Sequence, residues 1–285
     1  MNLYSTEMED YNGGFGGIGT GGGKGKGKNI PNQRKLDVEA QREQAKKAQQ
    51  DGERAESVEE FPIPKDYGDG SRIDFCWTRT HKHLLQRIVE QKEDDCWAWA
   101  LVRILQFYYN MNITAIAEQK TLSIKSLVKH VILGKKEAEN NNKLDKKSLA
   151  VTSFKRAIDY IFEKGIERDY GTQMYKIKAS FITKPNATPE EIRGLLLTQG
   201  PIGISVDLCG IFRQVYEFKE IYVLPEPKEN MERHALIIVG FGTTKDSKLF
   251  FIVQNTWGTK WGFNGYARII IKKTCPIFYV SELVN

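Results

Sequence analysis

The 285-residue sequence has few cysteines and histidines and lacks any long apolar run. Its four cysteines are well separated, at positions 76, 96, 209 and 275. If one of them is kept as a free thiol, the other three cannot all pair within one chain. This count disfavours a disulfide framework and favours a reducing, intracellular compartment.

Two further absences concern membranes and export. No stretch reaches the roughly 18 consecutive apolar residues that a spanning helix needs. The first 23 residues also lack the basic start and the apolar core of a secretory signal. We therefore expect no membrane-spanning segment and no secretory signal.

The first sixty residues contain few large apolar side chains. Residues 13–28, GGFGGIGTGGGKGKGK, are of low complexity and cannot bury enough surface to offset the entropy of ordering. Residues 34–61 are rich in helix formers, which fits either a solvated spacer or a docking segment. We predict that residues 1–60 are a disordered, Gly/Lys-rich and charged region.

Charge is unevenly distributed along the chain. Residues 1–60 hold nine Lys/Arg and eleven Asp/Glu, a net charge of −2. Because the whole chain has a net charge of +6, the remaining residues carry about +8. This mild excess favours solubility or a weak preference for acidic partners. It is not concentrated enough to predict a nucleic-acid or membrane partner.

Residues 61–171 have mainly helical signals. In the segment CWAWALVRILQFYY, five apolar side chains recur at a helical spacing: Trp97, Leu101, Ile104, Leu105 and Tyr108. Residues 123–133 and 153–165 show a similar period, the latter with a helix stop at Gly165.

One more helix is predicted after this region. Thr188 followed by Pro189 and two glutamates predicts a short helix up to residue 200.

Residues 172–285 carry mainly strand signals. The runs PIGISVDL, HALIIVGFG, KLFFIVQN and YARIIIKK are rich in branched and aromatic side chains and are separated by turn formers. We predict a largely antiparallel sheet, barrel-like in form. The helical signals precede the strand signals along the chain, which indicates an α+β fold with two lobes. We expect the functional site in a cleft between these lobes.

Cys96 lies at the start of the predicted helix. The positive end of a helix stabilises a thiolate, so this position suits a nucleophile, although cysteine is also a common core residue. Asp94 and Asp95 could cap the same helix end, yet their charges oppose a thiolate. Both interpretations of Cys96 stay open from this segment alone.

Two later segments favour the nucleophile. A thiolate works best with an imidazole that takes its proton, and of the four histidines only His234 opens a predicted strand in the second lobe. The segment QNTWGTKWGFNGYARI then places Asn255 at a strand end, where its oxygen could orient an imidazole. Trp257 could keep water away from that bond, as a wall of the site.

These three segments resemble the papain-like cysteine proteases. CWAWA is similar to that family's nucleophile segment, RHALIIVGFG to its histidine strand and QNTWGTKWGFNGYARI to its asparagine and tryptophan segment. The resemblance implies a peptidase domain over residues 61–285, with Cys96 as nucleophile, His234 as base and acid and Asn255 as the orienting group. It implies a polypeptide substrate, a possible protein inhibitor or partner, and no cofactor.

The resemblance has departures around the nucleophile. The family carries an oxyanion-stabilising glutamine six residues before its cysteine, whereas Gln91 is five residues before Cys96 and Glu93 replaces a companion cysteine. No GCNGG segment is present, and residues 133–148 are expected to form a solvated loop. Arg233 stands where many members have aspartate, and Glu232 where a small apolar residue is common.

Three functions are compatible with these departures. The first is a thiol endopeptidase that uses Cys96, His234 and Asn255, with Gln91 stabilising the oxyanion. The second is a catalytically weakened relative that binds peptides or a partner protein. An acyl transferase is the third, disfavoured by Asn255 in place of aspartate. The remaining histidines and cysteines show no metal-ligand spacing, so we expect no metal.

Overall fold

The computed structural model describes residues 63–284, apart from residues 65, 86–87, 92–94, 132–145, 170–175, 209, 214–219 and 226–231. The described residues belong to one compact unit, Glu60–Asn285. The predictions for residues 1–60, Glu93, Asp94 and Cys209 fall outside them. Among the described residues, no helix is both long and apolar enough to cross a membrane.

The predicted helix at Cys96 is present as α3, Cys96–Asn110. Of the five apolar side chains expected on one face, Leu101, Ile104 and Leu105 are fully buried and Trp97 and Tyr108 are half-buried. The opposite face holds Arg103 and Gln106, which are also buried. The helix is therefore surrounded by protein, which explains why it is apolar almost all round.

The other predicted helices are also confirmed. Residues 124–131 are helical, and α5 covers Lys146–Glu163. Its stop is Gly165, whose φ of 74° is unfavourable for residues with a side chain. The helix α6, Pro189–Gln199, begins with a capping box in which Thr188 and Glu191 each accept from the other's backbone N–H. The helix α5 starts at Lys146, so the end of the loop expected at residues 133–148 is helical and the rest lies outside the described residues.

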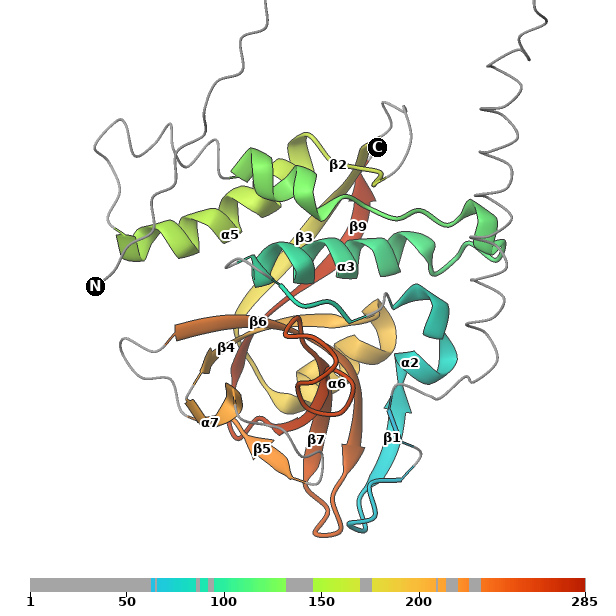
Figure 1. Ribbon diagram of the computed structural model, residues 1–285, viewed down its shortest axis with the longest axis vertical. Helices are drawn as coiled ribbons and strands as arrows, with labels where there is room; N and C mark the ends of the chain where they lie inside the picture. Colours follow the sequence, from blue (N-terminus) through green and yellow to red (C-terminus); the bar gives the residue numbers. More distant parts are fainter. Residues whose placement is uncertain are drawn as a thin grey trace, which may run out of the picture. The chain divides into compact units, whose positions relative to one another are not determined.

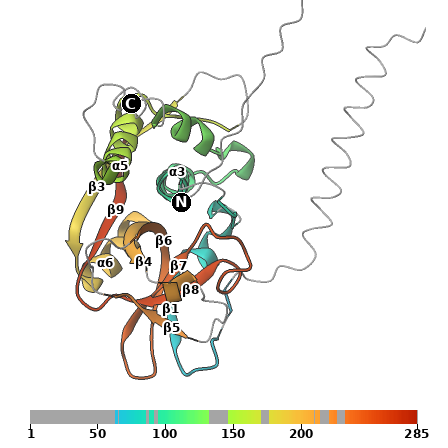
Figure 2. The ribbon, with the colours of Figure 1, turned by 60° about the vertical axis from the view of Figure 1, so that its left-hand side comes forward.

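Four short helical turns complete the helical part. They are α2 (Trp77–Thr80), η1 (Lys82–Leu84), η2 (Ile116–Glu118) and α7 (Gly210–Arg213). Packing places α3 against β6, β9 and β4 and α5 against β3, and the two helices contact each other. Figure 1 shows both helices beside the long β3 and β9 strands, and Figure 2 looks nearly along the axis of α3.

The strands form one mixed sheet. They are β1 (Arg72–Cys76), β2 (Ile166–Glu167), β3 (Lys176–Ala187), β4 (Ile202–Leu208), β5 (Ile221–Val223), β6 (Glu232–Thr243), β7 (Leu249–Gln254), β8 (Tyr266–Ile270) and β9 (Cys275–Val284). Their order is β2-β3-β9-β4-β6-β7-β8-β5, and β1 pairs with β6. All pairings are antiparallel except β5 with β8.

The α+β class and the mostly antiparallel sheet are confirmed, but the barrel-like closure is not. The two ends of the strand order, β2 and β5, are not paired with each other among the described residues. The physical reason is the direction of β3 and β9, which pair along most of their length and run away from β7 and β8 beside the helices (Figure 1). The sheet is therefore open.

The strand β6 lies at the centre of this arrangement. It pairs with β4 through Glu232–Ile238, with β7 through Ile237–Thr243 and with β1 through Gly240–Thr243. Ala235, Ile237 and Val239 face the core shared with α3, whereas Leu236 and Ile238 face a second core that includes α6. Burial on both faces explains the uninterrupted apolar run of this segment. The strand also carries His234.

Candidate active site

Cys96 is the first residue of α3 and is half-buried. The carbonyl oxygen of Asp95 accepts from the N–H of Ala98 at 2.9 Å and of Trp99 at 3.2 Å. The side chain of Asp95 makes no capping hydrogen bond, so the predicted side-chain cap is wrong for this residue. The thiol therefore lies at the positive end of a fifteen-residue helix whose first turn is closed by main-chain oxygen.

His234 is held by Asn255. Its Nε2 lies 2.7 Å from Asn255 Oδ1, and both side chains are buried, at 4% and 0% exposure. The N–H of Thr256 donates to the same oxygen at 2.7 Å. A backbone N–H can only donate, so it fixes the orientation of the amide and requires that His234 Nε2 carries the hydrogen. The imidazole therefore has a defined tautomer, with Nδ1 as its acceptor.

The backbone brings Cys96 and His234 together across 138 residues. The N–H of Ala235, next to the histidine, donates to Cys96 Sγ at 3.5 Å. Sulfur is a weak acceptor as a thiol and a better one as a thiolate, so this N–H favours the charged form of Cys96. The contact places the first turn of α3 against the start of β6.

The backbone of Asn255 is fixed by the hairpin that follows it. Its N–H donates to the carbonyl oxygen of Gly265 at 2.9 Å. Gly265 has a φ of 85°, and a Cβ added there would lie 2.4 Å from Ile88 Cγ2. A side chain would be both strained and in collision at this point. The glycine is therefore a requirement of the turn that holds the amide.

Trp257 covers the imidazole. Its ring is stacked on His234, with centroids 4.4 Å apart and planes 30° apart. Phe212 and Trp261 contact the indole edge-on, at 5.9 Å and 5.7 Å between centroids. The aromatic cluster excludes water from one face of the histidine, as expected for a wall of a site.

Gln91 lies beside the asparagine segment. Its N–H donates to the carbonyl oxygen of Thr256 at 2.7 Å, and its Oε1 accepts from the Thr256 hydroxyl. With Oε1 occupied in this way, Nε2 is the part of the amide that can donate to an oxyanion. Residues 92–94, which join Gln91 to Cys96, are outside the described residues.

Thr256 is the position that sequence reasoning missed. It contacts Asn255 through its N–H and Gln91 through its hydroxyl and its carbonyl, so one residue connects both predicted helpers. Its place directly after Asn255 in the motif was the available signal. The sequence cannot show that the segment before Cys96 folds back onto this residue.

The two departures next to His234 have different outcomes. Arg233 is exposed, and its Nε pairs with Asp207 Oδ1 at 3.2 Å on the neighbouring strand β4. Its charge is therefore partly offset and directed away from the imidazole. Glu232 begins β6, and its side chain lies outside the described part of the structure.

The other histidines are occupied elsewhere. His81 packs against Trp77 and Phe107, and His130 stacks on Tyr160 with ring centroids 4.7 Å apart, so both are half-buried. His83 is exposed. Within the described ranges, no group of three or more His, Cys, Asp or Glu is arranged to hold a metal ion.

Two other described thiols differ from Cys96. Cys76 and Cys275 are buried, at 3% and 4% exposure, and neither is in a disulfide. Burial raises the pKa of Cys76, and burial together with the nearby Asp207 carboxylate raises the pKa of Cys275 to about 12. Both are therefore protonated at neutral pH and chemically inert.

Sequence comparisons identify the family of the chain. The model of the papain family cysteine proteases matches residues 74–281. Ananain of Ananas comosus is 24% identical over 188 residues, which is 61% of this chain and 49% of ananain. A cathepsin L-like protein of Caenorhabditis elegans is 34% identical over 89 residues, 31% of this chain and 26% of that protein. The match to the cathepsin L of Sarcophaga peregrina also spans only 26% of that relative's length.

Solved structures agree on the fold. The bromelain protease of Ananas comosus in complex with the E64 inhibitor has a TM-score of 0.52 at 18% identity, covering 76% of this chain and 99% of that one. Digestive procathepsin L2 of Tenebrio molitor has a TM-score of 0.54 at 18% identity, covering 79% and 70%. With a family model that spans most of the described unit, the chain belongs to the papain family of cysteine proteases.

Proposed function

We propose that this chain is a cysteine-type endopeptidase in which Cys96 is the nucleophile, His234 the base and acid and Asn255 the orienting group. One observation carries the proposal: His234 is buried between Asn255 and Trp257 with its Nε2–H on the amide oxygen, while the adjacent N–H of Ala235 contacts Cys96 Sγ. This combination of a fixed tautomer and a thiol at a helix terminus is what thiol hydrolysis needs.

The acylation step follows from these positions. Nδ1 of His234 takes the thiol proton, and the Cys96 sulfur forms a bond to the carbonyl carbon of the scissile peptide. The oxyanion is stabilised by the Gln91 amide Nε2 and the positive end of α3. The C–N bond then breaks, and the imidazolium gives its proton to the leaving amine.

Deacylation uses the same groups. Nδ1 takes a proton from water, whose oxygen forms a bond to the thioester carbon. The bond to sulfur breaks, and the proton returns to the thiolate. Asn255 stabilises the imidazolium in both steps because its Oδ1 accepts from Nε2. Trp257 keeps water away from this hydrogen bond.

Labelling with iodoacetamide at pH 7 tests the nucleophile. We expect Cys96 to be modified at least tenfold faster than Cys76 and Cys275, mapped by mass spectrometry of tryptic peptides, because those two thiols are buried and protonated. His234→Ala should slow labelling of Cys96 and leave the other two unchanged. Equal labelling of all three thiols would contradict the proposal.

Turnover of a fluorogenic peptide library tests the reaction itself. We expect cleavage that Cys96→Ala abolishes, a loss of at least about a thousandfold. Cys275→Ala is the matched control and should cleave at the parent rate. A folded protein that labels at Cys96 but cleaves no peptide would favour the alternative, a weakened relative that only binds peptides.

A further inference from the structure

A buried arginine connects the helix of Cys96 to the strand that leads into Asn255. Arg103 lies in the middle of α3 and is 3% exposed. Its Nη1 donates to Gln254 Oε1 at 3.2 Å. Gln254 is also buried, ends β7 and directly precedes Asn255. This hydrogen bond therefore joins the element that begins at the nucleophile to the element that ends at the orienting amide.

Arg103 and Cys96 lie on the same face of α3. Seven residues make nearly two turns of an α-helix, so the two positions differ by about 20° around the axis and by about 10 Å along it. Cys96 Sγ accepts from the N–H of Ala235 on β6, and Arg103 donates to Gln254 on β7. This face of the helix is therefore bonded to the sheet at two points that are two turns apart.

Both partners of the Arg103 bond are held in place. The guanidinium carbon lies 5.0 Å from the centroid of the Trp99 ring, four residues earlier on the helix. The backbone of Gln254 pairs with β6 and β8, and its Nε2 donates to the Tyr266 hydroxyl at 3.0 Å. Because a guanidinium only donates, the amide oxygen must face Arg103 and the amide nitrogen must face the tyrosine. The bond therefore has a defined geometry that a shift of α3 along the strand would break.

The burial of this cation is better explained by geometry than by stability. Burial lowers the pKa of Arg103 to about 10, so the guanidinium is still charged at neutral pH. Transfer of a charge out of water costs free energy, and replacement of buried charged groups by apolar side chains of similar volume is often neutral or stabilising. A rigid donor that bonds to a fixed acceptor, in contrast, determines where the helix lies.

We propose that Arg103 is a positioning residue for the proposed hydrolysis. Its bond to Gln254 sets the register of α3 against the sheet, and with it the distance from Cys96 Sγ to the imidazole of His234. The inference rests on the proposed function, because it concerns the geometry of the same reaction. Proton transfer and attack both depend on this distance, and a displacement of about 1 Å can lower a rate about a hundredfold.

The double variant Arg103→Met with Gln254→Met tests the inference. It removes both partners of the bond, so that neither remains in the core without the other. With a fluorogenic peptide we expect kcat at least tenfold below that of the parent and KM within threefold. Iodoacetamide labelling of Cys96 at pH 7 should be at least threefold slower, and labelling of Cys275 should be unchanged. The urea midpoint of unfolding should equal or exceed that of the parent.

Gln254→Glu is the conservative variant. A carboxylate at this position still accepts from Arg103 and keeps the connection between α3 and β7. We expect kcat within threefold of the parent for this variant, whereas Gln254→Met alone should have the loss seen in the double variant. This pair gives a result even where the double variant does not fold.

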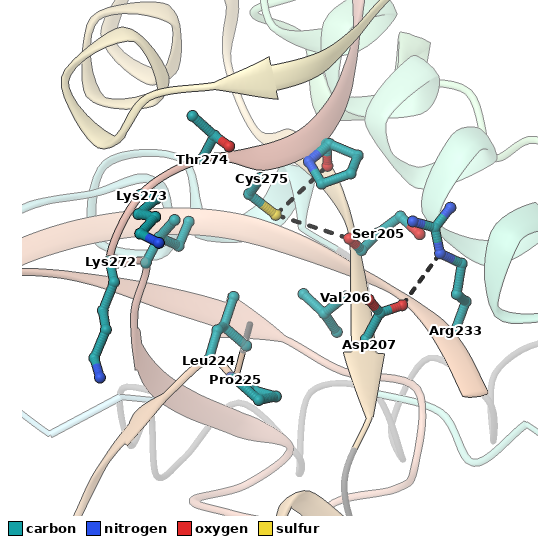
Figure 3. A pocket seen from close by; sticks show the side chains of 12 residues that line it. Ser205, Val206, Asp207, Leu224, Pro225, Arg233, Lys272, Lys273, Thr274 and Cys275 are labelled. Atoms are coloured by element: carbon teal, nitrogen blue, oxygen red, sulfur yellow. Dashed lines mark hydrogen bonds and ion pairs between the residues drawn. The ribbon is translucent and has the colours of Figure 1, made fainter. Parts of the chain in front are cut away.

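Arg233→Met is the control for the loss of one positive charge. Arg233 precedes His234 directly, but its side chain is 55% exposed and pairs with Asp207 at 3.2 Å, at the edge of a pocket on the sheet (Figure 3). Ion pairs at this exposure contribute little to stability. We expect kcat within threefold of the parent, because the buried bond of Arg103 is retained.

Gln106→Met is the control for the loss of a buried polar contact on the same helix. Gln106 Oε1 accepts from the N–H of Leu122 at 2.9 Å, a contact that does not involve β6 or β7. We expect a lower urea midpoint, because the variant leaves a buried N–H without this acceptor. Its kcat should stay within twofold of the parent.

Two results would overturn the inference for a parent that cleaves peptides. The first is a double variant whose kcat and Cys96 labelling both stay within twofold of the parent. The second is a loss of kcat in Gln254→Glu as large as that in Gln254→Met, which would show that the connection to Arg103 is not what matters. A parent that neither cleaves peptides nor labels at Cys96 would overturn the proposed function, and this inference with it.

Discussion

The two sides of the candidate active site are built differently. On the strand side, His234, Asn255 and Trp257 are joined by a 2.7 Å hydrogen bond and a stacked ring pair, within elements whose register is fixed by sheet pairing. On the helix side, Cys96 begins α3, and Gln91 reaches the site through backbone and side-chain bonds to Thr256.

This difference separates a constrained half from an adjustable one. The position of the strand side is fixed by sheet pairing, because a slip of one residue in β6 would turn His234 to the other face. On the helix side, Gln91 is positioned by Thr256, a residue of the strand side. The strand side therefore fixes the position of Gln91 as well as that of His234.

Among the changes that test this comparison, the largest effect is expected at Gln91, which bonds to Thr256 on the strand side. Gln91→Ala removes the proposed oxyanion donor and should lower kcat/KM about a hundred- to a thousandfold, measured with a fluorogenic peptide. Labelling of Cys96 by iodoacetamide should change less than threefold, because alkylation forms no oxyanion. A loss below about threefold in kcat/KM would show that Gln91 takes no part in catalysis.

The next effect tests the strand side. Asn255→Ala leaves His234 without its orienting oxygen and should lower kcat about tenfold to a hundredfold through misplacement of the ring. Asn255→Asp retains an acceptor and should recover part of this loss. Thermal unfolding distinguishes orientation from simple destabilisation, since a variant that melts with the parent but has a lowered kcat has lost only the position of the ring. A kcat unchanged from the parent in a folded Asn255→Ala variant would count against the orienting role.

A smaller effect is expected at the residue that connects the two halves. Thr256→Val removes only the hydroxyl on Gln91 Oε1, one neutral hydrogen bond, and should lower kcat about threefold to tenfold. Thr256→Ser retains the hydroxyl and is the matched control. In the Gln91→Ala background Thr256→Val should have no further effect, and additive losses would show that Thr256 does not act through Gln91.

The smallest expected effect on turnover lies outside the site, at Asp69. This carboxylate accepts from buried Arg268 at 2.7 Å, and its side chain is 31% exposed. Burial opposes its ionisation, but hydrogen bonds from Ser71 and Arg268 outweigh this and lower its pKa to about 2. A lowered pKa contributes stability above the unfolded value of about 4, and this stability is lost as pH falls from about 4 to 2.

Asp69→Asn tests this pair by thermal and urea unfolding. We expect a loss of about 2 kcal/mol at pH 7, since Arg268 is fully buried and Ser71 still accepts from it. Below about pH 2 the variant and the parent should converge. Turnover at neutral pH should stay within twofold of the parent, and a larger loss would indicate that the pair also supports the site.

The sequence predicted best where local pattern and tertiary environment coincide. The helices at Cys96, Lys146 and Pro189 and the strands β4, β6, β7 and β8 have strong periodicity or apolar runs. The strands β1, β2, β3, β5 and β9 were missed. In β3 the burial pattern does not alternate strictly, and β1 has only Cys76 fully buried, so both depend on partners distant in sequence.

The candidate site was predictable in its residues but not in its connections. The order of the three motifs pointed to Cys96, His234 and Asn255, because a nucleophile, a base and an orienting group each need a particular residue type. The bonds that Thr256 makes to Gln91 and Asn255 depend on a loop folding back across 165 residues, which no local pattern encodes. The open form of the sheet was equally hidden, since strand pattern does not determine which edges meet.

The central strand β6 has a consequence for how the molecule opens. Its amides are bonded to β4 near His234 and to β1 and β7 near its other end, with buried side chains on both faces. The amide hydrogens from Leu236 to Phe241 should therefore exchange with solvent only when the whole unit unfolds, as hydrogen exchange followed by NMR would show. We therefore expect the histidine to lie beside the slowest-exchanging amides of the described unit and to keep its position when other segments open.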